Sequence, residues 1–127
     1  MPVRSLSLSI LKWPDRDAVV AALRRWVERV CRERGDVVAV GYFGSYARGD
    51  WGVGSDLDLV IIIEDSDEPF ERRSAGWDTA SIPVPVDALV YTRAEWDAMD
   101  RSSRFRAMLD REAQWLARRA EAERGAG

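Results

Sequence analysis

Residues 56–63 read DLDLVIII and form the most hydrophobic run of the sequence, so they constrain the fold more than any other stretch. The run lacks the polar alternation of a strand with one wet face, and it is therefore typical of a strand buried on both faces. Such a strand needs a layer on each side, which predicts a central position in a sheet covered by helices. Asp56 and Asp58 nevertheless head this run, although a buried carboxylate is costly without a cation or hydrogen-bond donors.

The elements around this run predict an α/β fold, a small mixed β-sheet of three to four strands packed against helices. Residues 14–35 predict a helix that begins at Pro14 and Asp15 and stops at Gly35. Its apolar stripe recurs with the helical period. The stripe consists of Val19, Ala22, Leu23, Trp26, Val27 and Val30.

Further elements follow from local patterns. Residues 36–43 and 84–92 predict strands, the second with an edge position or irregular start because of Pro83 and Pro85. Residues 92–124 predict helix almost throughout, with a capping box formed by Thr92 and Glu95 and a break at 101–103. The remaining expectations are an edge strand at 5–10, a helical turn at 45–48 and a loop with a helical piece at 64–81.

Composition excludes several classes of chemistry. A length of 127 residues predicts a single domain over 1–127. The sequence has no histidine, which rules out a Ser-His-Asp triad, a Cys-His pair and a histidine-ligated metal. The single Cys31 rules out an internal disulfide and a cysteine-rich zinc site. The N-terminus resembles no signal peptide and no stretch is long enough to span a membrane, so we expect a cytoplasmic protein with no membrane partner.

The charged residues allow two interpretations of the arginine-rich segments. A net charge of -3 disfavours a general nucleic-acid partner. Eighteen of the nineteen basic residues are arginines, and they cluster in 23–34 and 101–124. Such clusters are typical of solvated helix faces paired with Glu and Asp, and they also suit an arginine-lined docking surface.

Three carboxylates are the candidate metal ligands. Asp56 and Asp58 are two apart on a strand, so their side chains emerge on one face, with Cα atoms about 7 Å apart. Asp87 lies inside another predicted strand, VPVDALV, and joins them if the two strands are neighbours. Hard oxygen ligands of this kind suit Mg²⁺, with Mn²⁺ as a substitute, together with phosphate oxygens.

The segment FGSYARG, residues 43–49, is the candidate phosphate cradle. Gly44 lets the backbone approach a ligand closely, and Ser45 offers a hydroxyl and an N–H at the start of a helical turn. Arg48 either braces the loop by pairing with a carboxylate or touches the ligand. Alone, a Gly-Ser pair is usually a turn, and an Asp-x-Asp is usually a strand entrance. Their combination is what points to a magnesium site that binds phosphates.

The stretch GSYARGDWGVGSDLDL resembles the GS-x10-DxD signature of the DNA polymerase β-like nucleotidyltransferase superfamily. It most resembles the minimal nucleotidyltransferases, the MNT group, which pair as antitoxins with HEPN proteins, and the resemblance covers residues 17–92. It implies that Ser45, supported by Gly44, contacts phosphates, that Asp56 and Asp58 bind metal, and that Asp87 completes the site and acts on the attacking hydroxyl.

By the same resemblance, the protein is an Mg²⁺-dependent enzyme that transfers a nucleoside monophosphate, AMP from ATP, to a hydroxyl. The acceptor lies on a helical HEPN-type partner protein. The Arg-rich region 101–119 and the loop 64–81, with Phe70 and Trp77, are the expected docking surfaces. Trp51 and Trp77 could stack on a base, although packing at the core edge is the commoner role for such aromatics.

Two alternatives remain open. One is a non-catalytic module that binds a nucleotide or a partner. The other is a small-molecule nucleotidyltransferase of the antibiotic-modifying type, whose mark would be a following helical domain lined with acidic residues. The segment after Tyr91 is short and Arg-rich, which disfavours the second alternative. Self-association into a homo-oligomer is also left open.

Overall fold

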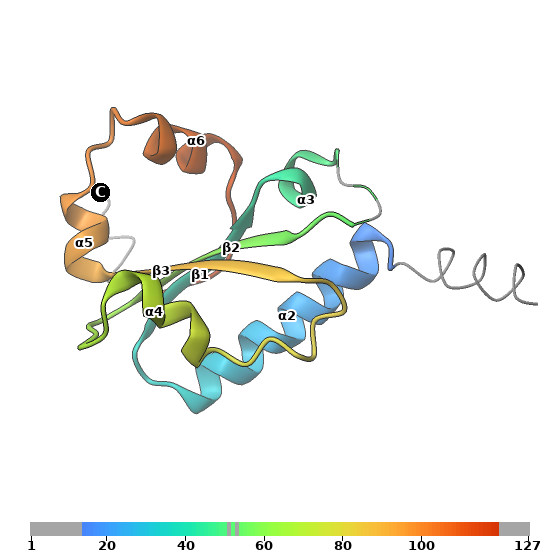
Figure 1. The fold of residues 1–127 in the computed structure, drawn as a ribbon, viewed down its shortest axis with the longest axis horizontal. Helices are drawn as coiled ribbons and strands as arrows, with labels where there is room; N and C mark the ends of the chain where they lie inside the picture. Colours follow the sequence, from blue (N-terminus) through green and yellow to red (C-terminus); the bar gives the residue numbers. More distant parts are fainter. Residues whose placement is uncertain (1–13, 51, 53, 120–127) are drawn as a thin grey trace, which may run out of the picture.

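The computed structural model describes residues 14–50, 52 and 54–119, which fold around one mixed four-stranded sheet in the order β3-β2-β1-β4 (Figure 1). β2 pairs antiparallel with β1 and parallel with β3, and β4 pairs antiparallel with the other side of β1. The predicted α/β class and the central position of the 56–63 run are therefore confirmed. The strands are β1 (Val37–Phe43), β2 (Leu57–Ile63), β3 (Val86–Thr92) and β4 (Gln114–Arg118).

The long helix α2 (Arg16–Glu33) begins and ends close to the predicted bounds. Asp15 is its N-cap, and the Asp15 side chain accepts a hydrogen bond from the Ala18 N–H at 2.8 Å. All six residues of the predicted stripe are buried, so the helical periodicity gave the correct face. The expected strand at 5–10 lies outside the described residues.

Two apolar clusters lie on opposite faces of the sheet. Leu57, Leu59 and Ile61 of β2 pack with α2, whereas Val60 and Ile62 pack with α5 and α6 on the other face. β2 is thus covered on both sides, as its continuous apolar run requires. The helices of the second face are α5 (Arg93–Ala98) and α6 (Arg104–Glu112).

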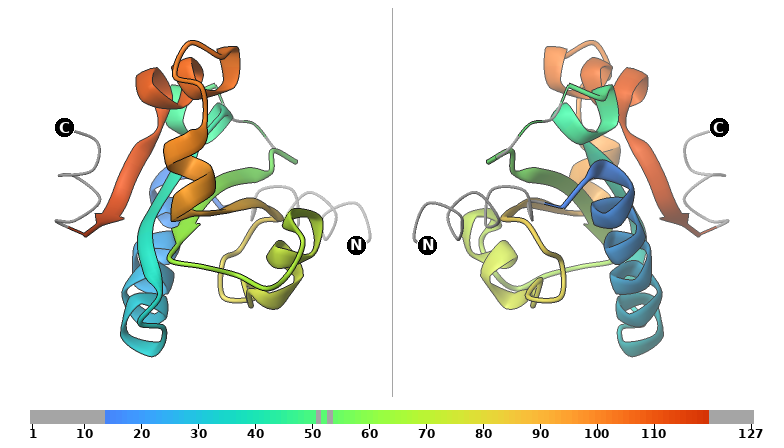
Figure 2. Two further views of the ribbon diagram at one scale, coloured as in Figure 1. Left: turned by 90° about the vertical axis from the view of Figure 1, so that its left-hand side faces the viewer. Right: turned by 90° about the vertical axis from the view of Figure 1, so that its right-hand side faces the viewer.

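The C-terminal prediction is wrong in part, because residues 114–118 form the strand β4 and not a helix. β4 lies at the outer edge of the sheet next to β1 (Figure 2). Gln, Leu, Ala and Arg are good helix formers, so local propensity favoured a helix here. β1 is buried along its whole length, however, and its backbone groups need partners on both sides. β4 supplies the second set, and tertiary pairing overrides propensity.

Other local predictions hold. Thr92 and Glu95 form the capping box of α5, and Ser103 caps α6 after the break. β3 is an edge strand, and the turn at 45–48 is the helix α3 (Ser45–Arg48). The 64–81 segment contains two short helices, α4 (Phe70–Arg73) and η1 (Ser74–Gly76).

Within the described ranges, no helix is long and apolar enough to cross a membrane.

Candidate active site

The strand register brings two of the three predicted carboxylates together. Asp58 of β2 and Asp87 of β3 are direct partners in the parallel ladder. Both lie on the α5 and α6 face, in alternation with residues of the α2 face such as Leu57 and Leu59. Asp56 immediately precedes β2 and is exposed. The three carboxylates therefore gather at one end of the β2 and β3 pair, although Asp56 is not a strand residue as expected.

Gly44 fits against the Asp58 carboxylate. Its φ of 76° and ψ of -150° belong to a conformation that is available essentially to glycine alone. A Cβ at this position would overlap Oδ2 of Asp58 and lie 3.2 Å from its Cγ. Glycine is thus required twice over, by the backbone and by the neighbouring side chain. The sequence analysis expected a close approach to a ligand here, and the structure shows a close approach to Asp58.

Asp58 is the carboxylate with the perturbed acidity. Burial raises its pKa above the usual value, and the negative charges of Asp87 and Asp56 raise it further. The positive charge of Arg48 acts in the opposite direction. The ionised form of Asp58 is therefore disfavoured, because only Arg48 offsets the burial and the two neighbouring negative charges.

Arg48 braces the loop, although it does not pair with Asp56, Asp58 or Asp87 as the bracing alternative required, and its contact with the nucleotide stays a prediction. Its guanidinium pairs with Asp50 at 3.1 Å and with Glu112 at 3.5 Å, not with Asp56 or Asp58. The hydrogen bond and charge of Asp50 raise the Arg48 pKa. Glu112 ends α6, so the contact joins α6 to α3. No sequence pattern indicated Glu112, because it lies 64 positions from Arg48.

The predicted phosphate contact, Ser45, is held by a second element that the sequence did not reveal. The Arg16 Nε donates to the Tyr46 carbonyl at 2.9 Å, and its Nη2 donates to the Tyr42 hydroxyl at 3.0 Å. α2 is thereby tied to α3 and β1. The Ser45 hydroxyl makes no hydrogen bond to any described residue. It is available to a ligand.

The three carboxylates are the kind of ligand that a hard divalent ion prefers, but their side chains are too far apart to hold one as they stand. Among the residues that the structure describes, no three acidic side chains stand close enough to hold a metal as they are. Like charges repel in the absence of a cation, and this repulsion contributes to the raised Asp58 pKa. Carboxylate oxygens are the ligands that Mg²⁺ prefers. The chemistry of the donors therefore fits Mg²⁺, and the ligand roles of Asp56, Asp58 and Asp87 remain predictions.

Trp77 packs beside the α2 core, as the commoner role predicts. Its ring centroid lies 6.1 Å from that of Trp26, and the Arg34 guanidinium lies over it at 4.1 Å. Trp77 is therefore engaged within the fold. Trp51 lies outside the described residues.

Solved structures share this fold at low sequence identity. A candidate nucleotidyltransferase from Sulfolobus solfataricus is 21% identical, with a TM-score of 0.57 over 84% of this chain and 86% of that one. A toxin–antitoxin complex with AMP-PNP is 17% identical, with a TM-score of 0.58 over 81% and 80%. A mutant of the toxin–antitoxin MntA–HpeT is 14% identical, with a TM-score of 0.52 over 89% and 82%.

Family membership comes from the sequence itself. No curated protein matches the chain. The family described as "Nucleotidyltransferase domain" matches residues 23–113, which include the C-terminal part of α2, the Gly44–Ser45 turn and all three predicted carboxylates. That match spans most of the chain, and the fold agrees with it. The protein therefore belongs to the nucleotidyltransferase domain family and is a transferase.

Proposed function

We propose that the protein is an Mg²⁺-dependent nucleotidyltransferase that transfers AMP from ATP to a hydroxyl of a partner protein, acting as the antitoxin of a HEPN-type toxin. The observation that carries the proposal is the juxtaposition at the end of β2. Asp58 and Asp87 are paired in register, and the Gly44 turn is fitted against Asp58. A fold has little use for a half-buried carboxylate that faces two others. A metal–nucleotide site accounts for it.

The candidate residues have different roles in this proposal. Asp56, Asp58 and Asp87 would hold Mg²⁺ or Mn²⁺. When bound, such an ion neutralises phosphate charge and stabilises the leaving pyrophosphate. The Ser45 hydroxyl, which has no hydrogen-bond partner among the described residues, donates to a phosphate oxygen beside the Gly44 turn.

Asp87 is suited to the acceptor side of the reaction. It is exposed on the edge strand β3, where an incoming hydroxyl can reach it from solvent. It accepts the proton of that hydroxyl while the oxygen attacks the α-phosphorus, and the bond to pyrophosphate breaks. One P–O bond forms as one breaks, and AMP remains on the acceptor.

The choice of nucleotide and of partner is supported by similarity to solved structures. One structural neighbour is a toxin–antitoxin complex with AMP-PNP, and another is the toxin–antitoxin MntA–HpeT. A HEPN-type protein, the partner that the sequence resemblance implies, would carry the acceptor hydroxyl.

The first prediction concerns Mg²⁺-nucleotide binding. Asp56→Asn combined with Asp58→Asn should abolish Mg²⁺-dependent binding of ATP, measured by calorimetry, because it removes two of the three anionic ligands. The fold should persist, since neither carboxylate accepts a hydrogen bond from a described residue. Circular dichroism and thermal melting check the fold.

Asp65→Asn combined with Asp67→Asn is the matched control, because it removes two charges with the same spacing from an exposed loop. This variant should bind as the wild type does. Wild-type affinity should also fall as the pH drops through the raised pKa of Asp58, since the protonated acid is a poor ligand. Undiminished binding in the first double variant would overturn the proposed site.

A further inference from the structure

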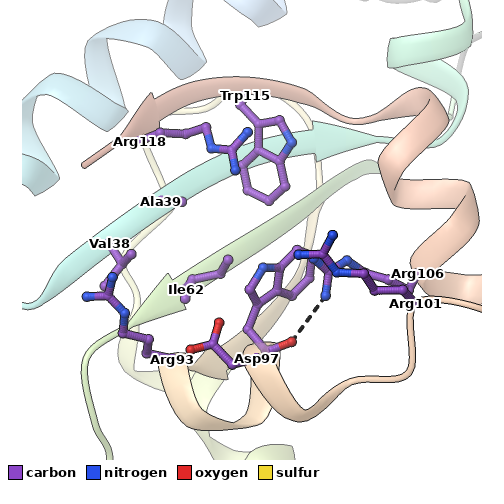
Figure 3. Close-up of a pocket in the computed structure, with 10 residues that line it drawn as sticks. Val38, Ala39, Ile62, Arg93, Asp97, Arg101, Arg106, Trp115 and Arg118 are labelled. Carbon is purple, nitrogen blue, oxygen red and sulfur yellow. Dashed lines mark hydrogen bonds between the residues drawn. The ribbon is translucent and has the colours of Figure 1, made fainter. Parts of the chain in front are cut away.

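A polar hollow lies beside the sheet, and Figure 3 shows the residues that line it. It lies on the same sheet face as Asp58 and towards the other end of β2, because Ile62 of β2 lines it. Its volume is about 250 Å³. Arg118 and Trp115 enter it from β4, and Arg101 and Arg106 enter from the α6 side. We name it the arginine pocket. It is lined by Val38, Ala39, Ile62, Arg93, Trp96, Asp97, Arg101, Arg106, Trp115 and Arg118.

The guanidinium of Arg106 is fixed within the wall. Arg106 is only 5% exposed, and its guanidinium stacks over the Trp96 ring at 3.9 Å. It donates to the Trp96 carbonyl at 3.1 Å and pairs with Asp110 at 3.3 Å. Stacking occupies the flat face of a guanidinium and leaves N–H groups along its edge. Because Asp110 already offsets its charge, Arg106 serves mainly as a rigid part of the wall that adds its remaining N–H groups to the lining.

Arg118 provides a second cation that lacks an acidic partner. Its guanidinium lies 5.1 Å from the Trp115 ring, and it forms no ion pair with a described residue. Trp115 and Trp96 are themselves in edge contact at 5.8 Å. The two tryptophans are thus in contact, and the guanidinium of Arg106 packs on Trp96 and that of Arg118 on Trp115.

The lining carries an excess of positive charge. It contains four arginines and one acid, Asp97. Arg93 is paired with Glu64 at 3.4 Å, and Arg106 with Asp110. These partners leave Arg118 uncompensated within the described part of the chain. The pocket therefore attracts a negative group, although the whole protein is acidic.

We propose that the arginine pocket binds a carboxylate side chain of the partner protein that carries the acceptor hydroxyl. This inference rests on the proposed function. Planar guanidinium edges match the two oxygens of a carboxylate. A nucleic acid would need an open basic stripe along which its backbone could run. The basic groups instead surround one hollow of about 250 Å³, which can admit the end of an acidic side chain.

The position of the pocket suits this role. Ile62 lines it, and Ile62 lies four residues along β2 from Asp58. At about 3.3 Å per residue, the pocket is about 13 Å from the carboxylates on the same face. α6 connects the two places, because Arg106 lies in the pocket wall and Glu112 contacts Arg48. A partner anchored in the pocket lies across the end of β2 and β3.

The test uses the full chain and a short probe, acetyl-Gly-Glu-Gly-amide. Its binding is followed by NMR through the indole N–H signals of Trp96 and Trp115. We expect the peptide to shift both signals, and the glutamine form of the peptide to shift neither. Arg118→Gln should weaken binding about tenfold, the effect of losing one charge-assisted hydrogen-bonded contact. Arg24→Gln, an exposed arginine of α2, should bind as the wild type does.

Two further probes separate the sources of negative charge. Inorganic phosphate and a thymidine oligonucleotide are titrated in the same way. Shifts with either of them and none with the glutamate peptide would overturn the carboxylate assignment, as would equal binding by Arg118→Gln. The backbone signals of Gly44 and Ser45 report Mg²⁺-ATP in the same spectra. If Mg²⁺-ATP does not shift the Gly44 and Ser45 signals while the peptide shifts the two tryptophan signals, the proposed nucleotide site is refuted and the pocket proposal is still supported.

Discussion

At the scale of single residues, the candidate site depends on what Gly44 lacks. A methyl group there would occupy the space of the Asp58 Oδ2 atom. Asp58 would then have to leave its place beside Asp87, with which it is paired in register. The turn and the carboxylates are thus one unit, in which the smallest residue fixes the position of the half-buried Asp58.

The second prediction separates Asp87 from the other two acids. Asp87→Ala should reduce nucleotidyl transfer by at least about a hundredfold, the lower range for loss of a general base, while the affinity for Mg²⁺-ATP changes far less. The side chain is exposed, so the fold should tolerate its loss. Single-turnover transfer and calorimetry measure the two effects.

Equal losses of transfer and of affinity would show that Asp87 acts chiefly as a ligand of the nucleotide-bound metal. Full activity would place the proton acceptor elsewhere. Asp67→Asn is the control, because Asp67 is an exposed acid between β2 and α4 and is not part of the carboxylate end or of the arginine pocket. Transfer of AMP should not depend on it.

Much of the site could be predicted from local sequence, and the remainder could not. Gly44, Ser45, Asp56 and Asp58 lie within fifteen positions, so their spacing alone suggested a common place. Asp87 needed the added assumption that its strand is a neighbour, which the parallel pairing bears out. Arg16 and Glu112 were missed, since each acts across the fold on a group at least 26 positions away.

At the scale of elements, α5 is secured by a charged network at its first turn. The Glu95 carboxylate accepts from the Thr92 N–H at 2.9 Å and pairs with Arg73, whose Nη2 lies 3.0 Å from Oε2. Arg73 also donates to the Val90 carbonyl at 3.1 Å. α4, β3 and α5 therefore share one guanidinium. The Arg73 pair and the Thr92 N–H lower the Glu95 pKa to about 2.

The third prediction follows from that pKa. Glu95→Gln should lower the free energy of unfolding at pH 7 by about 1 to 2 kcal/mol, because the charge of Arg73 loses its partner. The loss is smaller than the pKa shift alone implies, since Glu95 is 43% exposed and screened by solvent. Denaturant unfolding measures it.

The sign of the pH dependence is fixed by the direction of the shift. The folded-state pKa lies below the unfolded value near 4.5, so the contribution is fully present above about pH 5 and disappears as the pH falls towards 2. Wild type and Glu95→Gln should converge over that interval. Glu28→Gln, on an exposed part of α2, should not show this convergence. Parallel curves for wild type and Glu95→Gln would contradict the assigned role.

The strands and helices differ in how well local sequence predicts them. α2 and the capping box of α5 are decided by neighbours within a few positions, and both were predicted. β4 was not, because Gln114 to Arg118 become a strand only through β1, about 75 positions earlier. Local sequence contains good helix formers here and no signal that ends the helix after Glu112. The helix ends because the open edge of β1 pairs with residues 114–118.

At the scale of the whole molecule, the fourth prediction concerns the acceptor. Incubation with a co-expressed HEPN-type partner, Mg²⁺ and ATP labelled at the α-phosphorus should place the label on the partner, as detected by gel and intact mass. ATP labelled at the γ-phosphorus should leave the partner unlabelled, because that phosphorus departs with pyrophosphate. Asp87→Ala should fail to label the partner.

The pattern of labelling distinguishes the alternatives. Label from the γ-position on the partner would indicate a kinase reaction and contradict nucleotidyl transfer. A stable complex that takes up no label with either ATP would favour a non-catalytic binding module. Arg24→Gln serves again as the control, because its surface is exposed on α2 and far in sequence from the carboxylates.

The strand order also determines when the molecule can be completed during its synthesis. β1 and β2 are made early and can pair as soon as both have emerged, but the other side of β1 waits for residues 114–118. Throughout that interval the nascent chain offers a seven-residue hydrophobic strand with an open row of N–H and C=O groups. Such an edge is a template for pairing with another chain. The protein is therefore most prone to aggregation shortly before translation reaches β4, and slow codons just upstream of that strand would lengthen the exposure.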